Sequence, residues 1–368
     1  MKRILLVRLG HLGDIVHGLP SAAALRDLLP GVRIGWVVEQ RWTELLAASG
    51  AATAAAGTPE KPLVDDLHAV NTGAWRRAPL ASASWSAVRQ ASRDVRAAGY
   101  DAVIDLQGLW KSALLARWSG APVRIGFSRP KEAGVPWLYT RRVKTRRSHV
   151  IEQNLELVEG LTGQPTGPVR FALPRDLAAE DWCEQELSRL TKGPFAVLSP
   201  GAGWGAKLWP AGNFAGLARA LARQAGLTSL VNISPDQENL GKLVESASEG
   251  SARTIDCSIG RLVALMRRAS LAVGGDTGPI HLAAALGIPV VALFGPTNPE
   301  RNGPWGARAT VLRSPASRTS YAHVNRPDAG LRSISVENVV EAALRLLGTK
   351  AADESRDATA GSLGATIP

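Results

Sequence analysis

Residues able to carry chemistry gather in three glycine-rich segments, each placed directly after a short apolar run. These are residues 8–17, which contain Asp14, residues 199–210, which contain Lys207, and residues 272–285, which contain His281. Glycines let the backbone turn tightly and approach a ligand closely. A carboxylate can take a proton from a hydroxyl, and a lysine can neutralise charge on a departing phosphate. The three segments therefore predict a ligand site built from loops at strand ends.

Asp14 admits two roles on the residues alone. It falls in the opening turn of the helix whose pattern runs over residues 15–29, where a carboxylate interacts favourably with the helix dipole. It also follows the strand expected over residues 3–7, and ligands of α/β proteins bind at the ends of such strands. The pattern leaves both roles open. His17, one turn later, is predicted to be a packed side chain rather than a catalyst.

The third segment joins an apolar strand to an alanine-rich helix. Backbone N–H groups of Thr277 and Gly278 at the start of that helix would cradle a pyrophosphate. Pro279 suits the first turn, where its missing N–H does no harm. Asp276 is harder to assign, because a carboxylate repels phosphate; it would orient backbone amides or bind a hydroxyl. The alternative is a capped core helix without a ligand.

Two further signals lie in the same half of the chain. The glycines of residues 199–210, among them Gly201, permit close approach of a ligand, and Lys207 would neutralise a leaving diphosphate. Taken alone, this segment is a flexible loop with an exposed lysine. A weaker signal is the segment that ends in Glu238, which offers a carboxylate for ribose hydroxyls.

The elements that must position these residues are strands and helices in alternation, which predicts βαβ units and mostly parallel sheets. Strands are expected at residues 3–7, 33–38, 102–106, 195–198, 227–233, 271–273 and 289–294. Neither half carries G-x-G-x-x-G after its first strand, which disfavours a nicotinamide dehydrogenase.

The domain organisation follows from a break in this alternation. Glycine, proline and threonine are frequent between residues 161 and 174, which indicates a linker. The expected fold is α/β, with two Rossmann-like doubly wound domains, residues 1–165 and 175–348. Residues 349–368 are polar and without periodicity, which predicts a disordered tail.

The composition favours a cytoplasmic protein of two domains. The chain has 368 residues, of which 45% are apolar and 20% charged, which is ordinary for a globular protein. The apolar run at residues 4–7 is too short for a signal peptide or a membrane span. Cys183 and Cys257 lack metal-ligand spacing, so we expect buried thiols rather than a zinc site or a disulfide.

The positive charge of the chain is concentrated in one stretch. Residues 75–147 hold 15 Lys or Arg against 4 Asp or Glu, an excess equal to the net charge of +11 of the whole chain. The same stretch holds five tryptophans, and basic residues beside aromatic ones suit an anionic membrane surface or an anionic acceptor. A solvated basic face with core tryptophans is the alternative.

Four segments together resemble the ADP-heptose:lipopolysaccharide heptosyltransferases, glycosyltransferase family 9. The resemblance covers residues 5–39, 100–113, 198–213 and 271–306, with the motifs at residues 13–17, 100–108, 207–210 and 276–281. Residues 36–39 resemble the subfamily that adds the first heptose to the inner-core Kdo sugar. The chain departs from the family at residues 232–236, where the family has a glycine-rich turn before its acidic ribose contact.

The resemblance implies an inverting GT-B enzyme whose two domains face a central cleft, with the acceptor in the first domain and ADP-heptose in the second. It implies that Asp14 is the general base and that Lys207 assists departure of the donor phosphate. The implied donor contacts are Gly201, Lys207, Glu238, Asp276, Thr277, Gly278 and His281, and the implied acceptor contacts are Gly13, Lys111 and Arg124. No metal or cofactor is required, because Lys207 and the helix beginning near Thr277 supply positive charge.

The expected partners are an ADP-sugar and a lipopolysaccharide-type acceptor at the anionic inner face of the cytoplasmic membrane. Two alternatives stay open. One is a GT-B transferase with another nucleotide-sugar donor, and the other is a catalytically silent module that binds membrane or nucleic acid. The presence of both Asp14 and Lys207 argues against the silent module, and nucleic acid is disfavoured as a partner.

Overall fold

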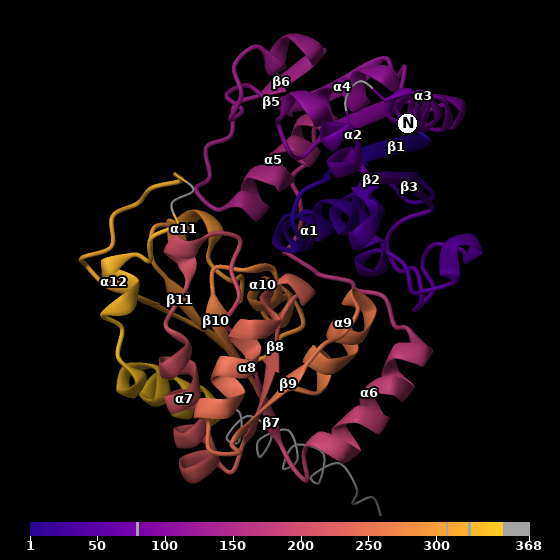
Figure 1. Ribbon diagram of the computed structural model, residues 1–368. Coiled ribbons are helices and arrows are strands. Elements are labelled where there is room, and N and C mark those ends of the chain that lie inside the picture. The colour runs from indigo at the N-terminus through magenta and orange to yellow at the C-terminus, as the bar shows by residue number, and fades with distance from the viewer. Residues whose placement is uncertain (79–80, 307, 323–324, 349–368) are drawn as a thin grey trace, which may run out of the picture. The chain divides into compact units, whose positions relative to one another are not determined.

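The computed structural model describes residues 1–78, 81–306, 308–322 and 325–348, and the disordered tail expected over residues 349–368 lies outside them. The chain divides into two compact units (Figure 1). The first holds Met1–Glu180 and Ile259–Ala264, and the second holds Asp181–Ser258 and Leu265–Pro368. The main division thus lies a few residues beyond the linker expected at residues 161–174, and the domain limits 1–165 and 175–348 stay predictions.

The first unit contains a six-stranded sheet of order β3-β2-β1-β4-β5-β6, in which all neighbouring strands are parallel. Its strands are β1 (Arg3–Val7), β2 (Arg33–Glu39), β3 (Asp66–Val70), β4 (Ala102–Asp105), β5 (Val123–Phe127) and β6 (Arg141–Val143). The α-helices of this unit are α1 (Leu12–Leu28), α2 (Thr72–Arg77), α3 (Ser82–Ala97), α4 (Trp110–Trp118) and α5 (Val150–Thr162). Short 3-10 helices lie at η1 (Gln40–Leu45), η2 (Ala51–Thr53) and η3 (Val135–Leu138). Helix α6 (Leu177–Leu190) spans the division.

The second unit repeats this topology, with a parallel six-stranded sheet of order β12-β11-β10-β7-β8-β9. Its strands are β7 (Phe195–Ser199), β8 (Thr228–Asn232), β9 (Ala252–Ile255), β10 (Leu271–Gly275), β11 (Val290–Phe294) and β12 (Ala309–Arg313). The α-helices are α7 (Ala211–Ala225), α8 (Glu238–Ala247), α10 (Gly278–Ala285), α11 (Pro299–Asn302), α12 (Ala329–Arg332) and a helix over residues 336–348. Two 3-10 helices, η4 (Gly205–Lys207) and η5 (Pro235–Gln237), lie in loops, and α9 (Ile259–Arg268) begins in the segment grouped with the first unit.

The central strands are buried on both faces, which explains their continuous apolar runs. Every residue of Ile4–Val7 in β1 is fully buried, and burial of one such side chain stabilises the fold by about 1.5–3 kcal/mol. Helix α1 is buried as well: from Leu12 to Leu25 every residue except Asp14 lies in the interior. The indole of Trp36 in β2 is also fully buried and packs on Gly18 of α1. Asp14 is therefore the one residue of this stretch that is open to solvent.

The structure confirms the α/β fold class and the two Rossmann-like doubly wound domains, and each expected strand lies within two residues of its predicted limits. His17 is buried and packs against the ring of His149 at 5.9 Å, as predicted. Both cysteines are free thiols, but only Cys183 is buried, whereas Cys257 is half-buried. Among the described residues no helix has the length and apolarity that a membrane span needs. That the two domains face a central cleft stays a prediction.

Candidate active site

Asp14 lies where the strand order of the first sheet reverses, between β1 and β4. Doubly wound sheets bind ligands at this switch point, at the carboxyl ends of the strands. Two hydrogen bonds join the loops that follow β1 and β4. The backbone N–H of Leu9 donates to Oε1 of Gln107 at 2.8 Å, and the guanidinium of Arg8 donates to the carbonyl of Leu106. The loop that carries Asp14 is therefore fastened to its neighbour.

Each carboxylate oxygen of Asp14 has a partner. Oδ1 accepts a hydrogen bond from Nη2 of Arg8 at 2.6 Å, and Oδ2 accepts one from the backbone N–H of His11 at 3.1 Å. Nε of Arg8 also donates to the backbone carbonyl of Asp14 at 3.2 Å. The Arg8 side chain is 8% exposed and that of Asp14 is 36% exposed. The carboxylate is thus held in one direction while it remains reachable from solvent.

Gly10 provides the space that this carboxylate occupies. A methyl group on Gly10 would overlap Oδ2 of Asp14. Gly10 is not among the glycines with a positive φ, so it is required for close approach rather than for backbone conformation. Only a residue without a side chain at position 10 therefore leaves room for the Asp14 carboxylate.

The surroundings of Asp14 keep it ionised. Burial raises the pKa of its carboxyl, but the Arg8 charge and the hydrogen bonds from His11 outweigh burial and hold the pKa well below its usual range. The carboxylate also satisfies the N–H of His11, the residue that precedes the first turn of α1. Asp14 therefore has the helix-end role that the sequence offered, and it is at the same time an ionised carboxylate open to solvent.

Lys207, Asp276 and His281 form one hydrogen-bonded cluster at the equivalent switch point of the second sheet, between β7 and β10. Nζ of Lys207 lies 2.6 Å from Oδ2 of Asp276 and 3.1 Å from the Asp276 carbonyl. Nε2 of His281 lies 3.0 Å from Oδ1 of Asp276. The Lys207 side chain is only 13% exposed, so the alternative of an exposed lysine, which the segment suggested when taken alone, does not hold.

Asp276 orients the side chains of Lys207 and His281, a role that the sequence did not indicate. Burial raises the pKa of its carboxyl, but the hydrogen bond with His281 and the charge of Lys207 lower the pKa far below the usual range. Because an ionised carboxylate only accepts hydrogen bonds, Nε2 of His281 carries the proton. Two of the three ammonium protons of Lys207 are used by Asp276, which leaves one for a ligand.

Three neighbours fix the Lys207 loop. Nζ of Lys207 lies 4.3 Å from the ring centre of Trp204, a cation–π contact. Gly275, at the end of β10, has no side chain, and a Cβ there would lie 3.0 Å from the Lys207 carbonyl. Trp209 is buried, donates from Nε1 to the Ile334 carbonyl at 2.9 Å and anchors the segment that follows. Lys207 is therefore placed before any ligand arrives.

Helix α10 begins at Gly278, beside this cluster, with Thr277 as its preceding cap residue and Pro279 in the first turn. Backbone N–H groups at such a helix start carry partial positive charge that favours a phosphate. The structure thus places Thr277 and Gly278 at the start of a helix, as the sequence predicted, and their contact with a diphosphate stays a prediction.

Of the two further expected donor contacts, Gly201 packs against a neighbouring loop, whereas Glu238 points to solvent. A Cβ on Gly201 would overlap Oε1 of Gln237, whose Nε2 donates to the Ala202 carbonyl at 3.1 Å. Glu238 is exposed and pairs with Lys242 at 2.6 Å, which lowers the pKa of its carboxyl. Gln237 is thus the residue of η5 that contacts the loop, and a ribose contact by Glu238 stays a prediction.

The three expected acceptor residues all lie in the first unit. Gly13 is buried in the first turn of α1, and Lys111 is exposed in the first turn of α4. Nε of Arg124 donates to the Leu138 carbonyl at 3.0 Å, and its Nη1 donates to the Ala121 carbonyl at 2.8 Å. Arg124 therefore supports the backbone around β5, and only part of its guanidinium can meet a ligand.

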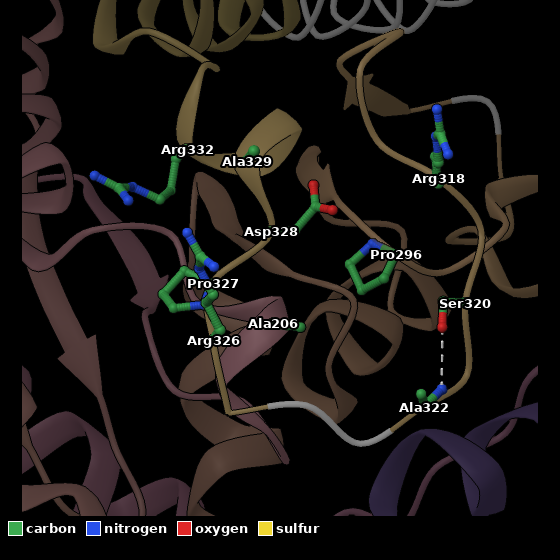
Figure 2. A pocket seen from close by; sticks show the side chains of 10 residues that line it. All are labelled: Ala206, Pro296, Arg318, Ser320, Ala322, Arg326, Pro327, Asp328, Ala329 and Arg332. Carbon is green, nitrogen blue, oxygen red and sulfur yellow. Dashed lines mark hydrogen bonds between the residues drawn. The ribbon is translucent and has the colours of Figure 1, made fainter.

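A cavity of about 370 Å³ adjoins the Lys207 loop in the second unit. It is lined by Ala206, Pro296, Arg318, Ser320, Ala322, Arg326, Pro327, Asp328, Ala329 and Arg332. In Figure 2, Arg326 and Arg332 stand on one side of Asp328 and Arg318 on the other. Oδ1 of Asp328 accepts from Ser317 Oγ at 2.6 Å and from the Leu331 N–H at 2.8 Å. The lining charges favour an anionic group.

Arg8 and Gly10 are the main site residues that sequence reasoning missed. A signal for Arg8 existed, because a charged residue that directly follows a buried strand needs a partner, and Asp14 is the nearest acid after it. Gly10 was noted only as part of a glycine-rich turn. Its specific role depends on the side-chain rotamer of Asp14, which no sequence pattern gives.

Comparison with known proteins identifies a family. The model of glycosyltransferase family 9 (heptosyltransferase) matches residues 88–329. "Lipopolysaccharide heptosyltransferase 1" of Pseudomonas aeruginosa is 29% identical over 320 residues, which cover 85% of this chain and 84% of that protein. "Lipopolysaccharide heptosyltransferase 3" of Escherichia coli is 26% identical over 364 residues, 94% of this chain and 98% of that protein.

Solved structures of this kind share the fold. A structure described as "E. coli heptosyltransferase WaaC with ADP" superposes with a TM-score of 0.74 at 24% identity, over 94% of this chain and 99% of that one. The crystal structure of a family 9 glycosyltransferase from Veillonella parvula gives a TM-score of 0.77 at 25% identity, over 94% of this chain and 97% of that one.

Proposed function

Because this chain belongs to glycosyltransferase family 9, the heptosyltransferases, we propose that it transfers heptose from ADP-heptose to the Kdo-containing inner core of a lipopolysaccharide acceptor. One observation carries the proposal. Each of the two sheets has its chemically active side chains at its own switch point, an ionised Asp14 in the first unit and Lys207 with Asp276 in the second. One centre suits a hydroxyl to be deprotonated and the other suits a departing diphosphate.

The reaction is a single displacement at the anomeric carbon of the heptose. The acceptor hydroxyl oxygen forms a bond to that carbon, its proton passes to Asp14, and the bond from the carbon to the β-phosphate oxygen breaks. General-base assistance of this kind contributes about 10² to 10⁴ in rate. Attack from the side opposite the leaving group inverts the anomeric configuration.

The leaving ADP gains negative charge as the bond breaks, and preorganised positive groups stabilise it. Lys207 supplies the ammonium proton that Asp276 does not use, and the start of α10 supplies backbone N–H groups. Asp276 holds Lys207 in place, so the Lys207 side chain does not have to be ordered during the reaction. Gly201 follows β7 and Gln237 and Glu238 follow β8, and the three residues are assigned to the nucleoside part of the donor.

The acceptor binds in the first unit, near Gly13, Lys111 and Arg124. An acceptor with carboxylate and phosphate groups suits the 15 basic residues of the segment 75–147. We assign the enzyme to the inner face of the cytoplasmic membrane, where such a lipid-linked acceptor is presented.

The test is ADP release from ADP-heptose in the presence of a deacylated Kdo-lipid A acceptor. ADP-glucose and UDP-glucose serve as alternative donors in the same assay, with thermal shift as a measure of donor binding. Release that depends on both ADP-heptose and the acceptor supports the proposal. Equal or faster turnover with another donor, or no binding of any nucleotide sugar, contradicts it.

A further inference from the structure

Two tryptophans of the first unit are exposed on adjoining elements. Trp137 in η3 is 82% exposed, and Trp110, which begins α4, is 45% exposed. The ring of Trp110 packs over Gly134, where a Cβ would lie 2.9 Å from the indole. The Gly134 carbonyl in turn accepts a hydrogen bond from the backbone N–H of Trp137 at 3.1 Å. Both indoles therefore lie around the same turn, beside the start of α4.

This turn is firmly held, so the exposure of its tryptophans is a property of the fold. The backbone N–H of Trp110 donates to Oε2 of Glu132 at 2.6 Å. Just after η3, the buried Tyr139 donates from its hydroxyl to Asp105 at 2.6 Å. Asp105 is itself fully buried at the end of β4 and also accepts from Ser112 Oγ at 2.9 Å. The elements that carry the two indoles are thus tied to the sheet.

The surroundings of the indoles are basic. Lys111 follows Trp110 directly, and Lys131 and Arg142 are exposed on either side of η3 in the sequence. Nε of Arg142 donates to the Pro136 carbonyl at 3.0 Å, which places this cation beside Trp137. Indoles with an apolar body and a polar N–H settle at the headgroup level of a bilayer, and basic side chains around them are attracted by anionic lipids.

We propose that this surface, the tryptophan patch of Trp110, Trp137, Lys111, Lys131 and Arg142, docks the enzyme on an anionic lipid bilayer. The inference rests on the proposed function, because it explains how the acceptor-binding unit stays at the membrane that presents the acceptor. Contact between an exposed indole and water is unfavourable, and insertion of the indole between lipid headgroups removes that contact.

The experiment is co-sedimentation of the whole protein with vesicles of phosphatidylglycerol and phosphatidylethanolamine, beside vesicles of phosphatidylcholine alone. Trp137→Ala should lower partitioning on the order of tenfold, in line with the loss of one large apolar side chain. Trp110→Ala/Trp137→Ala should lower it further. Trp85→Ala is the matched control, since Trp85 is 55% exposed on α3, outside the patch. Binding should weaken with salt, because exposed charges are screened over about 8 Å at 0.15 M ionic strength.

Turnover of the soluble deacylated acceptor separates this inference from the proposed function. We expect Trp137→Ala to keep that turnover while it loses vesicle binding and turnover of the vesicle-borne acceptor. Unchanged vesicle binding of Trp137→Ala would overturn the inference, as would an equal loss in Trp85→Ala. Lost soluble turnover with retained vesicle binding would instead make the patch an acceptor subsite. Vesicle binding without any heptose transfer would leave the patch intact and overturn the proposed function alone.

Discussion

Nη2 of Arg8 lies 2.6 Å from Oδ1 of Asp14, and this ion pair fixes both the direction and the basicity of the carboxylate. A guanidinium at this distance favours the ionised carboxylate, so Asp14 stays deprotonated even in mildly acidic solution. The same charge makes Asp14 a weaker base in the free enzyme. Arg8 is thus a positioning residue. It orients the Asp14 carboxylate and lowers the proton affinity of that carboxylate.

The first prediction concerns the effect of Arg8 on the pKa of Asp14. Arg8→Met removes the charge and keeps much of the length, so only the hydrogen bonds from His11 still oppose the effect of burial, and the pKa of Asp14 rises. Asp14 accepts a proton only when ionised, so the acid limb of the kcat/KM profile should move to higher pH, measured as ADP release between pH 4 and 9. Arg8→Lys should keep the limb near its original position. Arg33→Met, which breaks the exposed pair with Asp66 at 2.9 Å, is the control. An acid limb that Arg8→Met leaves in place would show that Arg8 does not tune the base.

The second prediction concerns Gly10. Gly10→Ala should lower kcat about a hundredfold, because a methyl group would displace Oδ2 of Asp14 and a shift of about 1 Å at a reacting group costs that much. Its melting temperature should fall only slightly, since Gly10 has no positive φ. Gly203→Ala is the control, because no heavy atom lies within 4 Å of a Cβ at that position. Near wild-type turnover of Gly10→Ala would mean that the Asp14 rotamer is not critical.

The third prediction concerns the buried pair of Lys207 and Asp276. Lys207→Met leaves the Asp276 carboxylate with His281 alone and should destabilise the fold by about 3 kcal/mol, the lower end for breaking a buried pair. The low pKa of Asp276 contributes stability that is complete above about pH 3.9, its unfolded value, and is lost as pH falls further. Lys207→Met raises that pKa, so its acid unfolding should begin at higher pH.

The double variant Lys207→Met/Asp276→Asn separates stability from catalysis. It removes both charges, so it should recover much of the stability lost in Lys207→Met, measured by urea denaturation. ADP release should stay low, because the diphosphate still lacks the Lys207 ammonium. If the double variant recovered turnover together with stability, Lys207 would have a structural role only.

The sequence indicated the central strands and the glycine-rich loops that carry the site residues, because buried parallel strands leave continuous apolar runs that end in glycine-rich turns. Strands β3, β5, β6, β9 and β12 were missed. They are outer strands with polar or half-exposed residues, such as Arg141 and Arg142 in β6, so they have no apolar run to detect. Their formation depends on pairing with a neighbour that is already in place.

The sequence named the members of the site but not their pairing. Asp276 and Lys207 were both selected, yet they are 69 residues apart and nothing in the chain indicates that they form an ion pair. Asp276 was expected to orient backbone amides or bind a hydroxyl, because its buried side-chain partners were unknown. Arg8 was missed for the same reason: its guanidinium reaches Asp14 and Leu106 at once only after β1 and β4 have paired.

The fourth prediction is that turnover survives chelation. Lys207 and the first turn of α10 provide the positive charge that the diphosphate needs, so EDTA should leave ADP release within about twofold of its original rate. The measurement is initial rate with and without EDTA, followed by addition of Mg²⁺. Loss of turnover that Mg²⁺ restores would show that a divalent cation shares this role.

The last prediction is that Asp14→Asn removes most transfer activity while donor binding persists. Asparagine has nearly the same shape and can still accept the hydrogen bond from the His11 N–H, so the start of α1 should remain intact. It cannot accept a proton, and the loss in kcat should be on the order of 10² or more. The ion pair with Arg8 is lost at a site that is 36% exposed, so the melting temperature should fall only slightly. Donor binding, followed by thermal shift with ADP, should match the wild type, because Lys207, Asp276 and His281 belong to the second unit. If a folded Asp14→Asn protein released ADP at nearly the wild-type rate, Asp14 would not be the base. Its role would then be limited to the hydrogen bond at the start of α1.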